Sequence, residues 1–209
     1  MSGAPFIALE GIDGTGKSTQ CRLLADWLRA RGYTVTHCAD PGGTPLGDQL
    51  RAILLDQRQQ MGLRAEVLLF MASRAELVER VIRPALAAGS AVVTDRFLVS
   101  NIVYQGHAGG LDPDELRRLS LFATDGLQPD LSVVLDLPVE RATTRRKPEA
   151  DRIEGRGAAH QEAVRQGFLA EARAHPERIR LVNAGRSVQE THGDVVREVE
   201  RVLEARARA

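Results

Sequence analysis

One short stretch carries residues whose types and spacing could bind a chain of phosphates. Residues 11–18, GIDGTGKS, match the pattern G-x-x-x-x-G-K-[ST] at every fixed position. Glycines let the backbone curl so that successive N–H groups point at one anion, and a following helix adds its positive N-terminal end. In this pattern the lysine reaches the β- and γ-phosphates and the serine hydroxyl ligates Mg²⁺. The residues expected to hold the nucleotide phosphates are Gly11, Ile12, Asp13, Gly14, Thr15, Gly16, Lys17, Ser18 and Thr19.

The segments on both sides of this loop have the patterns that the motif requires. Residues 6–9 form a short apolar run, which is typical of a buried strand. Residues 18–30 place leucines and a tryptophan at helical spacing. A strand, a glycine loop and a helix in this order favour a phosphate-binding loop over a chance glycine turn.

Composition predicts one globular domain over residues 1–209. The 28 basic and 28 acidic residues balance, which argues against a nucleic-acid polymer as the main partner. Cys21 and Cys38 are too few for a disulfide scaffold, and we interpret them as buried thiols. The sequence offers neither an apolar run long enough for a bilayer nor a signal peptide at residues 1–5. We therefore expect a cytoplasmic protein without a membrane partner.

Strand patterns alternate with helix patterns along the chain. The expected strands are residues 6–9, 33–37, 90–95, 131–137 and 179–183. The expected helices are residues 18–30, 46–55, 61–88, 113–122, 161–174 and 188–209. Pro84 marks a kink or a new turn, residues 101–110 look irregular, and Asp112 and Ser187 are expected N-caps.

This alternation predicts an α/β fold of the P-loop NTPase type, a five-stranded parallel sheet with helices on both faces. Ligands of such sheets bind beyond the carboxyl ends of the strands. The glycine loop, the turn at Asp40, Asp95 and the segment after Leu137 all fall at such ends, so we expect them to form one cleft. The charged segment at about 141–157 is interpreted as a lid.

A phosphate-binding loop does not identify a reaction, but further motifs do. A guanine-reading N-K-x-D or T-K-x-D is absent from the sequence, which argues against a GTPase. Several ordered stretches resemble the thymidylate kinase family, in its bacterial form with arginines in the lid. They are residues 6–20, FIALEGIDGTGKSTQ; 41–47, PGGTPLG; 69–74, LFMASR; 81–86, VIRPAL; 95–97, DRF; 104–106, YQG; and 151–154, DRIE. The family often has Arg-Glu before Pro41, where this chain has Ala39-Asp40.

The resemblance implies that a homodimeric enzyme phosphorylates dTMP to dTDP with ATP and Mg²⁺, in dTTP biosynthesis. It implies that Phe70 stacks on thymine, that Arg74 contacts the base or phosphate, and that Tyr104 lies by the sugar 2′ position. The acceptor-binding residues expected are Asp13, Pro41, Phe70, Arg74, Arg96, Ser100, Asn101, Tyr104 and Gln105. Periodicity alone favours a core role for Phe70, and polar loop residues are more often simply solvated.

Phosphoryl transfer requires cations around the moving group. Lys17 is one, and Arg96, at the end of a strand, would hold the acceptor phosphate, unless it is a solvated arginine. Asp95 could hold Mg²⁺ together with Ser18, or cap a turn. Asp13 is expected to contact the acceptor sugar or the Mg²⁺ shell, and its alternative is a carboxylate that stabilises the loop.

Some family members carry a catalytic arginine in the glycine loop, where this chain has Gly14. We expect the missing charge to come from Arg145, Arg146 or Arg152, although a run of charges is usually solvated surface. Two other functions stay open at this point. One is a kinase for another nucleoside monophosphate or a deoxynucleoside, and the other is a nucleotide-binding regulator without catalysis.

Overall fold

A parallel sheet of five strands forms the middle layer of the computed structural model, which describes residues 4–145 and 151–208. The strands run in the order β2-β3-β1-β4-β5 across the sheet. Their bounds are β1 Phe6–Glu10, β2 Val35–Ala39, β3 Ala91–Asp95, β4 Leu131–Asp136 and β5 Ile179–Asn183. The chain moves outward from β1 on one side and crosses after β3 to the other side, so a topological switch point lies between β1 and β3.

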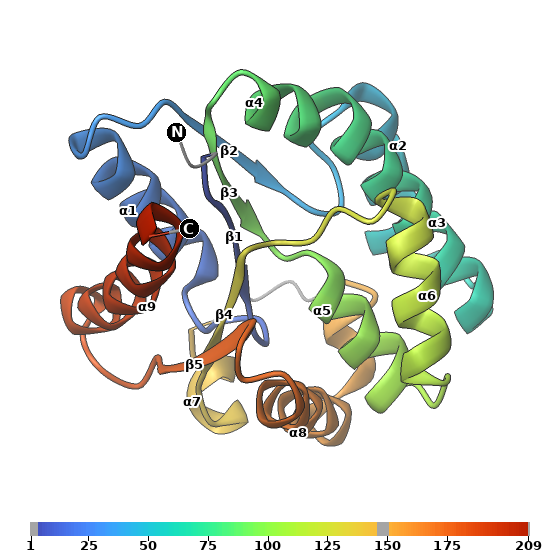
Figure 1. Ribbon diagram of the computed structural model, residues 1–209. Helices are drawn as coiled ribbons and strands as arrows, with labels where there is room; N and C mark the ends of the chain where they lie inside the picture. The colour runs from blue at the N-terminus through green and yellow to red at the C-terminus, as the bar shows by residue number, and fades with distance from the viewer. Residues whose placement is uncertain (1–3, 146–150, 209) are drawn as a thin grey trace.

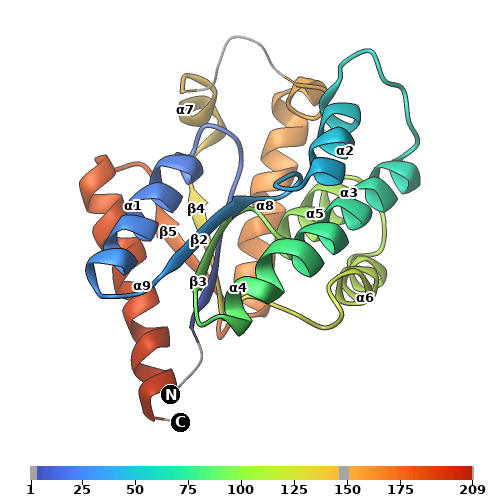
Figure 2. The ribbon, with the colours of Figure 1, turned by 90° about the horizontal axis from the view of Figure 1, so that it is seen from above.

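Helices cover both faces of this sheet (Figure 1), as the sequence predicts. The α-helices are α1 Lys17–Ala30, α2 Pro45–Leu55, α3 Leu63–Leu77, α4 Arg83–Ala87, α5 Leu98–Asn101, α6 Pro113–Ala123, α7 Val139–Thr143, α8 Ala158–Ala174 and α9 Val188–Arg208. Helices α1 and α9 lie together on one face, whereas α3, α5 and α8 lie on the other (Figures 1 and 2). Within the described residues, no helix combines the length and the apolar character that spanning a membrane would require.

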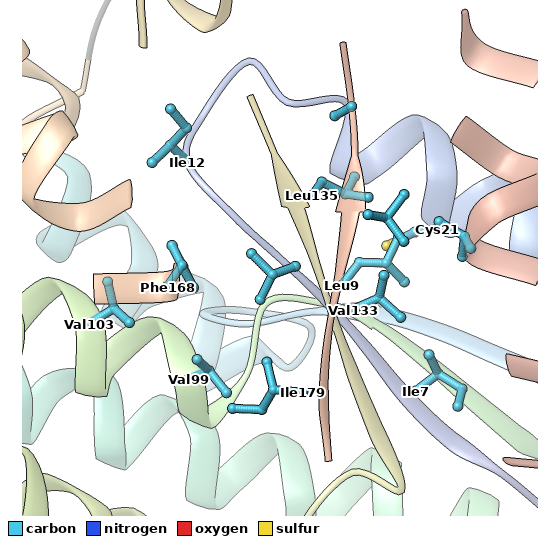
Figure 3. Packing of buried hydrophobic residues seen from close by; sticks show 14 of the residues in the cluster. Ile7, Leu9, Ile12, Cys21, Val99, Val103, Val133, Leu135, Phe168 and Ile179 are labelled. Carbon is cyan, nitrogen blue, oxygen red and sulfur yellow. The ribbon is translucent and has the colours of Figure 1, made fainter. Parts of the chain in front are cut away.

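The core lies on both sides of the sheet, and this explains why the strands read as continuous apolar runs. Every residue of β1 is buried, and its side chains alternate between the two layers of helices. Figure 3 shows Leu9 and Leu135 on one side of the strands near Cys21, with Val103 and Phe168 on the other. The sheet is thereby fixed between helices, and its carboxyl edge becomes a rigid support for the loops.

Three expectations about the elements need correction. The second strand is Val35–Ala39, two residues later than predicted, because it pairs in register with Ala91–Asp95. The predicted long helix is divided into α3, a π-helical turn Val78–Ile82 and α4, which carries Pro84 near its start. Residues 101–110 are not irregular.

Helix α5 continues into a second π-helical turn, Ile102–His107. Asn101, Tyr104 and Gln105 are buried there, so tertiary packing imposes a helical path on a stretch without helical periodicity. Both expected N-caps form: Asp112 accepts from the backbone N–H of Asp114, and Ser187 Oγ accepts from that of Glu190.

Helix α7 packs directly on the glycine loop. Gly14 has φ of +89°, and a Cβ placed on it would lie 2.1 Å from the carbonyl oxygen of Ala142. Gly16 has a similar φ of +94°, but nothing lies within 4 Å of where its Cβ would be. The two glycines therefore share a positive φ and differ in the space around them.

These two positions allow a matched test of the packing between α7 and the loop. Gly16→Ala should reduce the free energy of unfolding by about 1 kcal/mol, because alanine is strained at positive φ. Gly14→Ala should cost at least about 1 kcal/mol more, because the loop or α7 must move. Urea unfolding of both variants checks this, and equal losses would show that α7 does not constrain the loop.

Candidate active site

Two cavities meet at the carboxyl edge of the sheet, where the cleft is predicted. The larger, of about 990 Å³, is lined by the glycine loop, Asp95, Arg145 and residues 184–188. The smaller, of about 140 Å³, lies between α2, α3 and the segment that includes α5. The residues that line both are Asp13, Asp40, Arg51, Arg96 and Asp151. In Figure 2, α2 and α7 lie at this end of the sheet.

The side chain of Lys17 is folded into the glycine loop. Its Nζ donates to the carbonyl oxygens of Gly11 and Ile12, both at 3.0 Å, and lies 3.4 Å from Asp13 Oδ1. Burial, reinforced by the charge of Arg96, lowers the pKa of the Lys17 ammonium. The amine is thus held close to the place where the loop would receive phosphate oxygens.

Two oxygen ligands of the kind that Mg²⁺ prefers lie next to each other beside the loop. Ser18 Oγ donates a hydrogen bond of 2.6 Å to Asp95 Oδ2. Among the described residues, no group of three or more His, Cys, Asp and Glu side chains could hold a metal ion. A hydroxyl and a carboxylate with room for phosphate and water oxygens fit Mg²⁺, which seldom has an all-protein cage.

Arg96 connects the two cavities. Its Nη2 lies 2.5 Å from Asp13 Oδ1 and 3.1 Å from the Tyr104 hydroxyl. Its Nη1 donates to the Gly11 carbonyl at 3.0 Å and to Ser100 Oγ at 3.1 Å. Burial alone would lower the pKa of Arg96, but Asp13 and other nearby acidic groups raise it well above its ordinary value. The guanidinium stays charged at the junction of the cavities.

The floor of the smaller cavity is formed by part of a buried chain of polar side chains, which continues beyond the cavity lining to Glu66. Arg74 donates from Nε to Asp40 Oδ2 at 2.5 Å and from Nη2 to Asn101 Oδ1. Asn101 Nδ2 donates to Gln105 Oε1 at 2.9 Å, and Gln105 Nε2 donates to Glu66 Oε1 at 2.8 Å. All five side chains are buried. Their hydrogen-bonding groups are therefore held in fixed directions.

Phe70 lies both in the hydrophobic core and at the wall of the smaller cavity, so its stacking role stays a prediction. It is 7% exposed and belongs to the main hydrophobic cluster, yet it also lines the smaller cavity. Pro41, Ser100 and Tyr104 line the same cavity. The residues expected around the acceptor thus lie together.

The expected lid arginines do not share one location. Arg145 lines the larger cavity, and its Nη1 donates to the Ala184 carbonyl at 3.1 Å. Arg152 lies 2.7 Å from Glu66 and donates to the Leu54 carbonyl at 2.8 Å. Arg146 lies outside the described residues, as do Lys147 and Pro148.

Three charged residues of this region were not predicted from the sequence. Arg51 lines both cavities and donates to the Pro41 carbonyl at 2.7 Å. Glu66 and Glu10 are completely buried next to site residues. Of these three, only Glu10 could have been noticed in the sequence: it directly follows the apolar run 6–9, and a glutamate at the end of a buried strand is unusual.

A glycine loop with a buried lysine, an adjoining Ser–Asp oxygen pair and a second cavity lined with arginines define a P-loop phosphotransferase for a phosphorylated acceptor. The family model described as thymidylate kinase matches residues 9–195. The chain therefore belongs to the thymidylate kinase family, which confirms the resemblance and the P-loop NTPase fold.

Individual relatives agree over nearly the whole chain. A thymidylate kinase of Symbiobacterium thermophilum is 47% identical over 205 residues, 97% of this chain and 96% of the relative. One of Rhodopirellula baltica is 46% identical over 185 residues, covering 88% and 76%. The crystal structure of thymidylate kinase from Ehrlichia chaffeensis superposes with a TM-score of 0.76 at 30% identity, covering 95% of this chain and 99% of that one.

Glu10 makes the stability of the folded protein depend on pH. Its Oε1 accepts from the backbone N–H of Phe97 at 2.9 Å and its Oε2 from Ser100 Oγ at 2.5 Å. Burial raises the pKa of Glu10 above its ordinary value of 4.5, although Ser100 and Arg96 partly oppose this. The folded state therefore holds the Glu10 proton more tightly than the unfolded state. Its contribution to stability is complete below pH 4.5 and is lost as the pH rises through the raised pKa.

Glu10→Gln should remove this dependence, because glutamine stays neutral yet can accept from Phe97 and donate to Ser100. The variant should gain stability over the parent as the pH rises above about 4.5, by at most about 1.4 kcal/mol per pH unit. Urea unfolding of both proteins from pH 4 to pH 8 measures the difference. Parallel curves over that range would contradict the raised pKa.

Proposed function

We propose that the protein transfers the γ-phosphoryl group of ATP to dTMP, with Mg²⁺, to give ADP and dTDP. The observation that carries this proposal is the junction of the two cavities. The phosphate-binding loop opens into one cavity and Phe70 into the other, and Asp13, Arg51 and Arg96 line both. A donor phosphate and an acceptor phosphate would meet there.

The smaller cavity suits a flat base better than a chain of phosphates. Phe70 offers an aromatic face, and base–aromatic stacking contributes about 1–3 kcal/mol in other proteins. The floor formed by Arg74, Asn101 and Gln105 presents polar atoms in fixed directions, as recognition of a base requires. Tyr104, which lies against Arg96 and Asp13, would border the sugar.

In the proposed reaction an oxygen of the acceptor phosphate attacks the γ-phosphorus, and the bond to the β,γ-bridging oxygen breaks so that ADP leaves. Lys17 would bind the donor phosphates, and Arg96 with Arg51 would hold the acceptor phosphate. Mg²⁺ at Ser18 and Asp95 would neutralise charge on the donor phosphates. Positioning and charge neutralisation account for most of catalysis in this class of reaction.

We further infer that the enzyme works as a homodimer in the cytoplasm. Leu68 of α3 is 59% exposed and Phe122 of α6 is 84% exposed, and these two helices lie side by side (Figure 1). Apolar side chains of this size on adjacent helices suit a contact with a second copy. The two cysteines are free thiols, as a reducing compartment would keep them.

The choice of acceptor is tested by measuring ADP release with each nucleoside monophosphate in turn. We expect dTMP to give the highest kcat/KM, because the aromatic face of Phe70 and the fixed polar atoms of Arg74, Asn101 and Gln105 favour one base over others. A higher kcat/KM for another nucleoside monophosphate would show that the protein is a kinase for that acceptor instead. ATP binding without turnover of any acceptor would support the regulator without catalysis.

Arg145 should supply the charge that Gly14 cannot. Arg145→Ala should lower kcat by at least about 10²-fold, the lower end for loss of a group that stabilises the transition state. Lysine should restore little of it, because it lacks the planar fork of arginine. Arg141→Ala is the matched control. Arg145 donates to the Ala184 carbonyl and Arg141 donates to the neighbouring Gly185 carbonyl, but Arg141 does not line the larger cavity. Equal kcat values for the two alanine variants would contradict the role of Arg145.

A further inference from the structure

Glu66 is a buried carboxylate that is not among the groups proposed to react, yet it forms ion pairs with two arginines of a segment distant in sequence. It is on α3 and completely buried. Arg152 Nη1 lies 2.7 Å from its Oε2, and Arg156 Nη2 donates to the same oxygen. Two cations on one buried carboxylate oxygen offset much of the cost of burying that charge. Segment 151–156 is thereby attached to α3.

The attachment shapes the acceptor cavity. The backbone N–H of Arg152 donates to the Leu55 carbonyl, and its Nε donates to the Leu54 carbonyl, so the segment also lies against the end of α2. Asp151 and Ile153, on either side of Arg152, both line the smaller cavity. The wall formed by these two residues is thus held in place through the contacts of Arg152.

Glu66 also fixes the hydrogen bonds across the cavity floor. At one end Arg74 can only donate, so Asn101 turns its carbonyl oxygen toward it and its amide nitrogen toward Gln105. At the other end Glu66, as a carboxylate, can only accept, so Gln105 turns its amide nitrogen toward it. Both amides are oriented consistently by the charges at the two ends.

We propose that Glu66 is a positioning residue for the acceptor: it fixes segment 151–156 as a cavity wall and, through Gln105, orients the cavity floor. Base recognition and the position of this segment are coupled through one carboxylate. The proposal rests on the proposed function, because it takes the smaller cavity as the acceptor site. It does not require dTMP in particular, since any monophosphate that the parent enzyme phosphorylates can report the effect.

The first test is the steady-state kinetics of Glu66→Gln, which keeps the shape and removes the charge. The KM for the accepted monophosphate should rise about 10-fold, the size expected for loss of a coupled contact, while the KM for ATP stays within about twofold. The matched control is Glu171→Gln. Glu171 is also buried and contacts two basic side chains, Arg117 and His107, but neither Glu171 nor these partners line either cavity, whereas the Glu66 partner Gln105 lines the smaller one.

A double-mutant cycle separates positioning from a general loss of stability. Arg156→Gln should raise the same KM in the parent, but by less than about twofold in the Glu66→Gln background, because the contact is already lost. Arg156→Lys should restore part of the loss by keeping a charge. The Arg156 side chain is 26% exposed, so the single variants Arg156→Gln and Arg156→Lys test the proposal even if Glu66→Gln fails to fold.

Three results would overturn the proposal. One is an acceptor KM within about twofold of the parent in folded Glu66→Gln or Arg156→Gln, which is less than a coupled contact should cost. Another is an equal change in Glu171→Gln, and the third is full additivity in the cycle. Failure of the proposed function is a separate result, because the parent itself would then phosphorylate no monophosphate.

Discussion

The contact between Arg96 and Asp13 joins the two halves of the site. Arg96 follows β3 and Asp13 follows β1, so the pair bridges the switch point of the sheet. Arg96 has φ of 68°, a left-handed conformation that costs a non-glycine residue roughly 1–2 kcal/mol. Its guanidinium offsets this strain through contacts with Asp13, Gly11, Ser100 and Tyr104. The strain is retained where it directs a permanent cation into the junction of the cavities.

The ion pair between Arg74 and Asp40 serves to orient the side chains of the cavity floor more than to stabilise the fold. Both side chains are almost completely buried, and burial raises the pKa of Asp40 even though Arg74 opposes the shift. Replacing such a pair with apolar groups of similar volume is often neutral or stabilising. What the pair supplies is a guanidinium with fixed donors, and through Asn101 that orientation extends along the cavity floor.

Features with short-range patterns could be predicted from the sequence, and features that depend on distant partners could not. The sheet, the glycine loop and the pair Ser18–Asp95 follow from local runs, spacing and strand ends. The π-helical turn Ile102–His107 could not be predicted from hydrophobic periodicity, because contacts with α6 and α8 stabilise it. Glu66 and Arg156 are 90 positions apart in sequence, so no local signal could link them.

The glycine at position 14 and the arginine at position 145 are related by packing. A side chain at position 14 would collide with the Ala142 carbonyl, so α7 can approach the loop because glycine is there. The same approach places Arg145, two residues beyond the end of α7, in the lining of the larger cleft. An arginine inside the loop and a helix packed against it are therefore mutually exclusive in this geometry. In this chain the close-packed helix occupies the space of a loop side chain and brings Arg145 to the cleft in which we propose that the donor phosphates bind.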